Sequence, residues 1–219
     1  MAVKGRSAKQ RATVVAERLT LEYPQAVCEL NHRNPFELLT ATILSAQTTD
    51  ERVNVVTPEL FARYPDASAL AAADPTVVEQ IIRSAGFYQV KTRNLVATAQ
   101  SLVERFDGHV PTALEDLITL AGVGRKTANV VRSVAFGLPG LPVDTHVGRL
   151  SRRLGLTTEK DPVKVETELG RYLPPQAWGD FSLRMILHGR RVCFAKKPSC
   201  AQCTLEDVCP SSIMPRARK

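Results

Sequence analysis

Four of the five cysteines lie in the last 27 residues, and their spacing limits what this end of the chain can fold around. Cys193, Cys200, Cys203 and Cys209 follow the pattern C-x6-C-x2-C-x5-C. Structural zinc sites usually pair their ligands as two close C-x(2–4)-C units, whereas this segment has one close pair and a single cysteine on each side. A four-iron four-sulfur cubane takes one thiolate at each of four corners, which three short loops can supply. The spacing therefore predicts one 4Fe-4S cluster held by residues 193–209.

Zinc is the alternative metal for these thiols, and two disulfides are a third arrangement. The chain shows no signal peptide or other export signal, so we expect a cytoplasmic protein whose thiols stay reduced. The fifth cysteine, Cys28, lies far upstream in the sequence. We expect it to be a small buried apolar side chain rather than a further ligand.

The net charge of the chain is +7, and the basic residues gather at its two ends. Residues 1–21 carry five basic side chains against Glu17 alone, and residues 190–219 carry seven against two acidic ones. If both ends fold together, they form one basic face, which favours a polyanion such as nucleic acid. A solvated basic surface is the alternative. No apolar run approaches the ~20 residues that cross a bilayer, so we expect no membrane partner.

Helix start signals recur along the chain, and sustained alternation of apolar and polar residues is not seen. A capping side chain directly precedes a proline at three positions: Asn34, Asp74 and Asp161. Thr112 and Glu115 have the spacing of a capping box. Apolar residues recur at helical spacing from 95 to 106, and a glycine at 108 is a stop signal. These patterns predict an all-α chain of about ten helices.

A Gly-x-Gly turn joins two expected helices at residues 113–120 and 125–136. Gly122 and Gly124 permit positive φ and a close approach of another molecule to the backbone. The helix that follows directs its free N–H groups and its positive dipole end to the same place. On a basic chain this predicts a site for DNA phosphate. A dinucleotide-binding fingerprint is disfavoured, because Thr127 replaces its third glycine and a helix precedes the turn, but a simple tight turn remains an alternative.

Four segments resemble those of one family, the endonuclease III DNA glycosylases. Residues 120–131, LAGVGRKTANVV, are similar to its helix-hairpin-helix, and residues 143–146, VDTH, to its catalytic aspartate segment. Residues 43–50, ILSAQTTD, are similar to its first pocket helix, and the cysteine spacing resembles its cluster loop. The resemblance covers nearly the whole chain. It implies an enzyme that removes oxidised pyrimidines from double-stranded DNA and then cleaves the strand at the abasic site, acting as a monomer near the bacterial nucleoid.

The same resemblance implies two domains. A helical barrel domain is expected at 28–138, with the hairpin at about 113–136 inside it. Residues 1–27 and 139–219 are expected to form the iron–sulfur cluster domain, with the cluster loop at 193–209. Residues 137–142, GLPGLP, are predicted to be an irregular crossover. The catalytic residues are then expected to face each other across a cleft between the domains.

Lys126 and Asp144 are the candidates for chemistry. An amine can attack a glycosidic carbon and form a Schiff base with the opened sugar. Lys126 lies in the expected first turn of a helix, where the dipole and the adjacent Arg125 disfavour its cation. Phosphate contact is the alternative role for Lys126. Asp144 has the position of an N-cap, and the resemblance makes it the catalytic aspartate that stabilises positive charge on the sugar and helps to deprotonate Lys126.

Further residues are expected to contact DNA through the resemblance. Removing a base from the duplex leaves a space that must be filled. In the family a glutamine and a leucine fill it; Gln47 matches the glutamine, whereas Phe87 stands where the leucine would be. This departure leaves the preference for the opposite base open. His146 matches a histidine beside the pocket, and Arg125 belongs to the hairpin that contacts phosphate.

Two lysines lie inside the expected cluster loop. Lys196 and Lys197 follow Cys193 on a stretch that ends at Cys200, so ligation at both ends would hold them in place for phosphate contacts. A solvated charge pair is the alternative. His188, which also matches the family, is expected to pack in the interior.

Three other functions fit parts of this pattern. An adenine-mismatch glycosylase of the same superfamily shares the hairpin, the aspartate and the cluster, but it lacks the lysine at 126 and has a further C-terminal domain. A noncatalytic iron–sulfur DNA-binding protein would not require both Lys126 and Asp144. An electron-transfer protein with one cluster would not require such a large basic, helical scaffold.

Overall fold

The computed structural model describes residues 6–215, and these residues form eleven α-helices and several short 3-10 turns with no strand among them. The all-α prediction is therefore confirmed. No helix in this part of the chain has the length and apolar character needed to span a membrane. The described chain divides into two compact units, one made of residues 6–27 and 139–215 and the other of 28–138.

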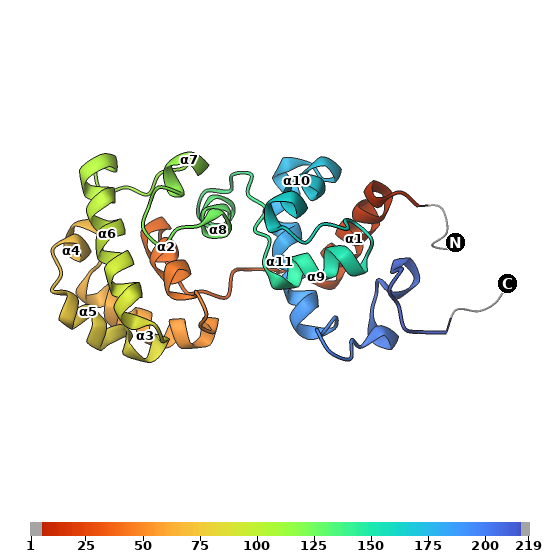
Figure 1. Cartoon of the computed structure of the whole chain (residues 1–219), viewed down its shortest axis with the longest axis horizontal. Helices are drawn as coiled ribbons and strands as arrows, with labels where there is room; N and C mark the ends of the chain where they lie inside the picture. The colour runs from red at the N-terminus through yellow and green to blue at the C-terminus, as the bar shows by residue number, and fades with distance from the viewer. Residues whose placement is uncertain (1–5, 216–219) are drawn as a thin grey trace. The chain divides into compact units, whose positions relative to one another are not determined.

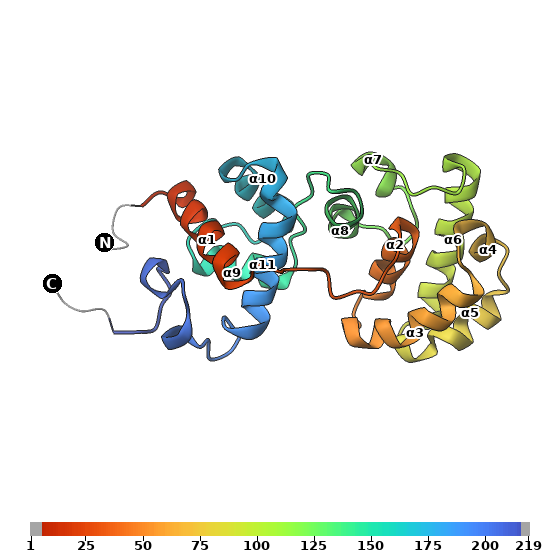
Figure 2. The same ribbon diagram turned by 180° about the vertical axis from the view of Figure 1, so that it is seen from behind.

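The unit at 28–138 is built around a helix that is buried along its whole length. Its elements are α2 (Pro35–Leu44), α3 (Asp50–Arg63), α4 (Ala67–Ala71), α5 (Pro75–Ile82), a 3-10 turn at Arg83–Ala85, α6 (Tyr88–Phe106), α7 (Leu114–Leu117) and α8 (Arg125–Phe136). Each residue of α2 from 36 to 44 is buried, and the helix contacts α3, α6 and α8 (Figures 1 and 2). The long helix α6 packs against α4 and α5. One apolar core joins these elements.

Local signals explain most of the helix boundaries. The side chain of Asn34 accepts a hydrogen bond from the Glu37 amide at 2.9 Å, and the Asp74 and Asp161 side chains cap α5 and α10 (Pro162–Tyr172) in the same way. The capping box predicted at Thr112 is wrong. Helix α7 starts one residue later, with Ala113 at its N-cap and no side-chain cap, and the Thr112 carbonyl accepts a hydrogen bond from Arg132.

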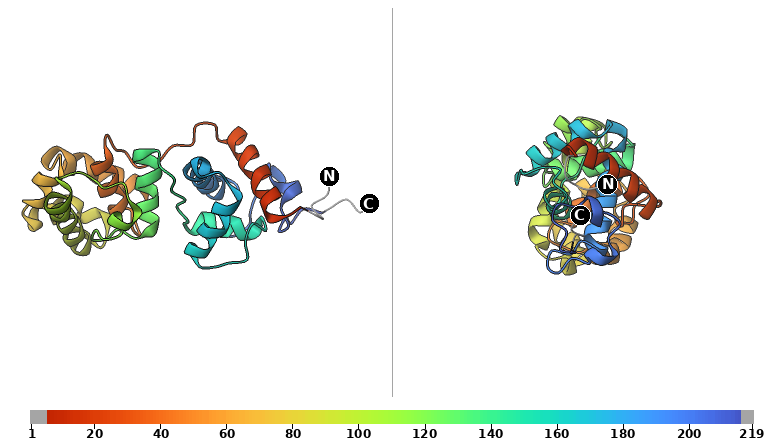
Figure 3. Two further views of the ribbon diagram at one scale, coloured as in Figure 1. Left: turned by 90° about the horizontal axis from the view of Figure 1, so that it is seen from above. Right: turned by 90° about the vertical axis from the view of Figure 1, so that its right-hand side faces the viewer.

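The unit formed by residues 6–27 and 139–215 has its own core. It contains α1 (Ala8–Glu22), α9 (Thr145–Arg153), α10 (Pro162–Tyr172), α11 (Trp178–Arg191) and short 3-10 turns that include Cys200–Gln202 and Glu206–Val208. Helix α11 packs against both α1 and α9. In Figure 3 the red helix α1 lies beside the dark blue segment that follows α11, and Arg18 pairs with Asp207 there. Residues from the two ends of the sequence therefore build one body.

Candidate functional site

The two glycines of the hairpin have different structural roles. Gly122 has φ +73°, and a Cβ atom there would lie 2.8 Å from Asn94 Nδ2, so both the backbone conformation and the packing require glycine. Gly124 has φ −88° and is the N-cap of α8, and a Cβ atom built on it meets no heavy atom within 4 Å. Only Gly122 uses the positive φ that both glycines permit. The space beside Gly124 leaves the backbone open to another molecule.

Lys126 and Arg125 lie in the first turn of α8, where the sequence predicted them, and both are exposed in their unit. Glycine at the N-cap has no side chain that could accept hydrogen bonds from the first-turn amides. These amides, the dipole of α8 and two cationic side chains form a surface that suits an anion.

Gln47 and Phe87 are exposed residues in the left-handed region of backbone conformation, with φ of 55° and 47°. Gln47 lies in the turn after α2, and Phe87 directly precedes α6, with 65% of its surface exposed. Such a conformation is unfavourable for a side chain with a Cβ atom, and it concentrates at functional positions. Lys197, with φ 51°, and Asp107 also have it.

Asp144 caps helix α9, as predicted. Its Oδ1 accepts a hydrogen bond from the Val147 amide at 2.8 Å, which fixes the orientation of the carboxylate. His146 lies in the first turn of α9, where burial lowers its pKa and the Asp144 carboxylate opposes that shift. Gly189 of α11 lets the histidine approach closely, because a Cβ atom there would lie 2.8 Å from His146 Nδ1. Lys126 and Asp144 belong to different units of the chain.

Helix α9 also binds the start of the cluster loop. Arg149 Nη2 donates hydrogen bonds at 3.0 Å to the carbonyls of Gly189 and Cys193. One turn further, Arg153 donates to two later carbonyls of the loop, and its Nη1 lies 3.3 Å from Cys193 Sγ. The helix that begins at Asp144 is therefore joined to the loop by two guanidinium groups.

The four cysteines predicted to hold the cluster line a single pocket. None of the four is in a disulfide, and burial raises the pKa of Cys203 to about 11 and also raises that of Cys209. Among the described residues, no three His, Cys, Asp or Glu side chains gather closely enough to hold a single metal ion. A cubane is larger than an ion and holds its thiolates further apart, so four thiols around one pocket fit its shape.

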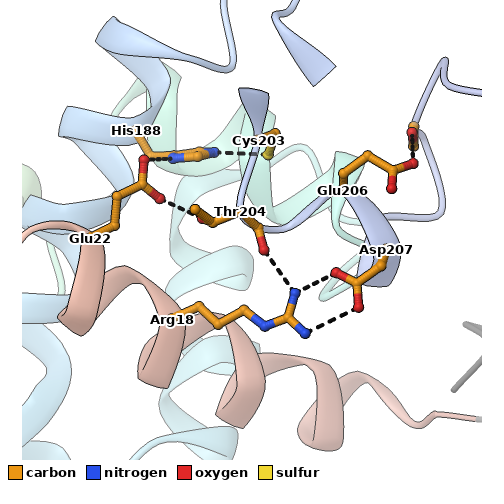
Figure 4. A network of polar contacts seen from close by, with 8 residues as sticks. Arg18, Glu22, His188, Cys203, Thr204, Glu206 and Asp207 are labelled. Carbon is orange, nitrogen blue, oxygen red and sulfur yellow. Dashed lines mark hydrogen bonds and ion pairs between the residues drawn. The ribbon is translucent and has the colours of Figure 1, made fainter. Parts of the chain in front are cut away.

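Helix α1 holds the cluster loop through a network of polar contacts (Figure 4). His188 Nε2 lies 3.3 Å from Cys203 Sγ, and His188 Nδ1 lies 3.2 Å from the Tyr23 hydroxyl and 3.5 Å from Glu22. The Thr204 hydroxyl donates to Glu22. Burial lowers the pKa of His188. His188 is thus buried, as expected, but it also contacts a cysteine of the pocket.

The lysines at 196 and 197 are exposed on the loop between Cys193 and Cys200. The basic face predicted from the chain ends lies partly outside the described residues, because these omit Lys4 and the three basic residues after position 215.

Sequence reasoning missed several residues of these sites. Arg149 and Arg153 are four positions apart on one helix face, which was a signal that both could bind one partner segment. Lys91 is buried, with 4% of its surface exposed. Its signal was its position four residues before Leu95, which places a lysine in line with the apolar stripe of α6.

Comparison with known families gives one consistent result. A family model described as HhH-GPD superfamily base excision DNA repair protein matches residues 40–175. Endonuclease III of Synechocystis sp. is 53% identical over 207 residues, which cover 94% of each chain. Endonuclease III of Escherichia coli is 41% identical over 201 residues, covering 92% of this chain and 95% of the relative.

Solved structures agree with the sequence relatives. An endonuclease III–DNA complex and a trapped covalent endonuclease III–DNA intermediate each match with a TM-score of 0.89 and 43% identity, over 93% of this chain and 96% of the other. A thermostable thymine-DNA glycosylase, at 20% identity and a TM-score of 0.84 over 93% of this chain and 97% of its own, shares the fold.

Proposed function

Because the chain belongs to the endonuclease III family, and is therefore a base-excision DNA glycosylase with an associated abasic-site lyase activity, we propose that Lys126 is its nucleophile. The observation that carries this assignment is the exposed amine in the first turn of α8, next to an uncapped glycine turn. Phosphate bound at Gly122, Gly124 and Arg125 would bring the sugar to this amine.

The reaction then uses two groups of the chain. The amine of Lys126, once deprotonated, attacks C1′ of the damaged nucleotide, and the bond from C1′ to the base breaks as the base leaves with a proton. The amine's second proton passes to O4′ as the C1′–O4′ bond breaks and the sugar ring opens to the Schiff base. Loss of a proton from C2′ then expels the 3′ phosphate, which cleaves the strand. Asp144, held by its cap bond, stabilises the positive charge on the sugar and helps to remove protons from Lys126.

We assign one 4Fe-4S cluster to Cys193, Cys200, Cys203 and Cys209. The four cysteines line one pocket and none is in a disulfide, which supports this assignment. Bound there, the cluster would cross-link four thiolates and supply folding free energy to the loop. Lys196 and Lys197 would then contact phosphate from a loop that is fixed at both ends.

The substrate proposed for this site is an oxidised pyrimidine in double-stranded DNA, or an abasic site. The exposed, left-handed residues Gln47 and Phe87 would enter the space that the extruded base leaves, and His146 would lie beside the pocket. We propose that the protein acts as a monomer on DNA in the bacterial cytoplasm.

Borohydride trapping on a thymine-glycol duplex tests the nucleophile, because reduction of the Schiff base joins protein to DNA. The unaltered protein should form the adduct, and Lys126→Gln should abolish it while DNA binding is retained. Lys164→Gln, at an exposed lysine on α10, is the matched control and should form the adduct as the unaltered protein does. A trapped adduct with Lys126→Gln would refute the assignment. Base release without any adduct from the unaltered protein would indicate a monofunctional glycosylase instead.

The same duplex tests Asp144. Asp144→Asn keeps a capping oxygen but loses the charge, so base release should slow by about 10²–10⁴-fold. Cleavage of a preformed abasic site should suffer less, because no base departs in that step. Equal losses in the two assays would contradict the role given to the carboxylate.

A further inference from the structure

Lys91 joins the two turns that carry Gln47 and Phe87. Its Nζ donates hydrogen bonds to Thr48 Oγ1 at 2.6 Å and to the Ala85 carbonyl at 2.8 Å. Thr48 directly follows Gln47, and Ala85 lies two positions before Phe87. One buried ammonium group therefore links the turn after α2 to the turn before α6.

The surroundings of Lys91 explain how a cation is tolerated there. Both acceptors are neutral oxygens, and burial lowers the pKa of the lysine. The Ala85 carbonyl lies at the C-terminal end of the helical segment 75–85, where carbonyl groups lack helical partners and carry the negative end of the dipole. The two acceptor oxygens thus stabilise part of the ammonium charge, but the buried ammonium loses its hydration.

The ammonium is not needed to satisfy the groups around it. The Thr48 hydroxyl already donates to the Ala85 carbonyl, so this carbonyl would keep a partner if Lys91 were absent. A methionine at 91 would bury a stem of similar length, leave no orphaned polar atom and avoid the loss of hydration. Stability alone therefore does not account for a lysine at this position.

We propose that Lys91 is a positioning residue for base extrusion, which holds Gln47 and Phe87 at a fixed separation. This inference rests on the proposed function of these two residues. Each has a backbone conformation that persists only where the surrounding structure enforces it. The link through Thr48 and Ala85 supplies that enforcement to both turns at once. Without the ammonium group, only the hydrogen bond from Thr48 to Ala85 joins the two turns, so they relax more readily when they meet DNA.

Base release from two thymine-glycol substrates tests the proposal with Lys91→Met. One substrate is fully paired. In the other, called the gapped duplex, the lesion lies opposite an abasic site, so that no base pair has to be broken. Activity on the paired duplex should fall about 10- to 100-fold, the range for misplacing a positioning group. Activity on the gapped duplex should fall much less, because extrusion is easier there. The midpoint of thermal unfolding should stay equal or rise.

Three further variants make the test specific. Thr48→Val removes the hydroxyl that links the turns and should reproduce the paired-duplex defect. Arg93→Met, at an exposed cation on α6, is the control and should have no effect on the ratio of the two activities. In a Gln47→Ala, Phe87→Ala background, Lys91→Met should cause no additional loss, because Lys91 acts through these residues.

Several outcomes would overturn the inference. These are an equal loss on both substrates, an additional loss in the double-alanine background, or a lowered unfolding midpoint with full activity per folded molecule. Absence of base release by the unaltered protein would refute the proposed function itself, which is a separate result.

Discussion

Substituting alanine at each glycine of the hairpin should separate stability from DNA binding. At Gly122 an alanine must adopt φ +73°, which costs about 1–2 kcal/mol for an L-residue. Its Cβ atom would also lie 2.8 Å from Asn94 Nδ2 and 3.0 Å from the Asn94 Cβ, and such overpacking costs about 1–3 kcal/mol. The free energy of unfolding should therefore fall by about 2–5 kcal/mol, which lowers the midpoint of thermal unfolding by about 4–20 °C.

Gly124→Ala is the matched control, because its φ of −88° suits any residue and its Cβ atom meets nothing within 4 Å. Alanine is a weaker N-cap than glycine, which lowers the unfolding free energy, but it makes the unfolded chain less flexible, which raises it. The two effects offset each other, so the unfolding free energy should change by no more than about 0.5 kcal/mol. DNA binding should nevertheless weaken, because the new methyl group occupies the space through which phosphate approaches.

Adding Asn94→Ala to Gly122→Ala should recover the packing part of the loss and leave the backbone part. Calorimetry measures stability, and fluorescence anisotropy with a labelled duplex measures binding. If Gly122→Ala unfolds like the unaltered protein, or if the Gly124→Ala protein loses as much stability as Gly122→Ala, the division of roles is wrong.

The remaining predictions concern the cluster loop. Lys196→Ala and Lys197→Ala should each weaken binding to damaged and undamaged DNA by similar factors, and each should reduce the slope of log K against log salt by about 0.9; unchanged slopes in both would exclude phosphate contacts. In the apoprotein, iodoacetamide attacks the thiolate, so labelling of Cys203 should increase about tenfold per pH unit up to its raised pKa of about 11. Peptide mass spectrometry follows the labelling, and a rate that levels off near pH 8.5 would contradict the burial of this thiol.

Features fixed by neighbouring residues could be predicted from the sequence. Asn34 and Asp144 cap their helices because a cap depends on a side chain and an amide three positions away. The cysteine spacing predicted one site for all four cysteines, because short loops limit how far they can separate, and the four do line one pocket. Phe87 is exposed, and its role in filling the space of the extruded base stays a prediction.

Features that depend on distant segments could not be predicted in this way. The Thr112 capping box is wrong: helix α7 begins one residue later, and the Thr112 carbonyl contacts Arg132, twenty positions away. The contact of His188 with Cys203 requires α11 and the cluster loop to meet. The role of Lys91 emerges only when the turns at 48 and 85 come together, which no periodicity in α6 encodes.

One of the two units is made of two separate segments of the chain, and this sets the order in which the units fold during synthesis. Helix α1 buries Ala12, Val15 and Leu19 in a core. The other buried residues of this core are Tyr23, directly after α1, and residues that all follow position 138. The residues from 28 to 138 can form their own core as soon as they have left the ribosome. At about 5–20 residues per second, α1 waits roughly 10–30 s for α11 to emerge. Throughout this interval its apolar face is a target for chaperones, and assembly of the cluster loop comes last.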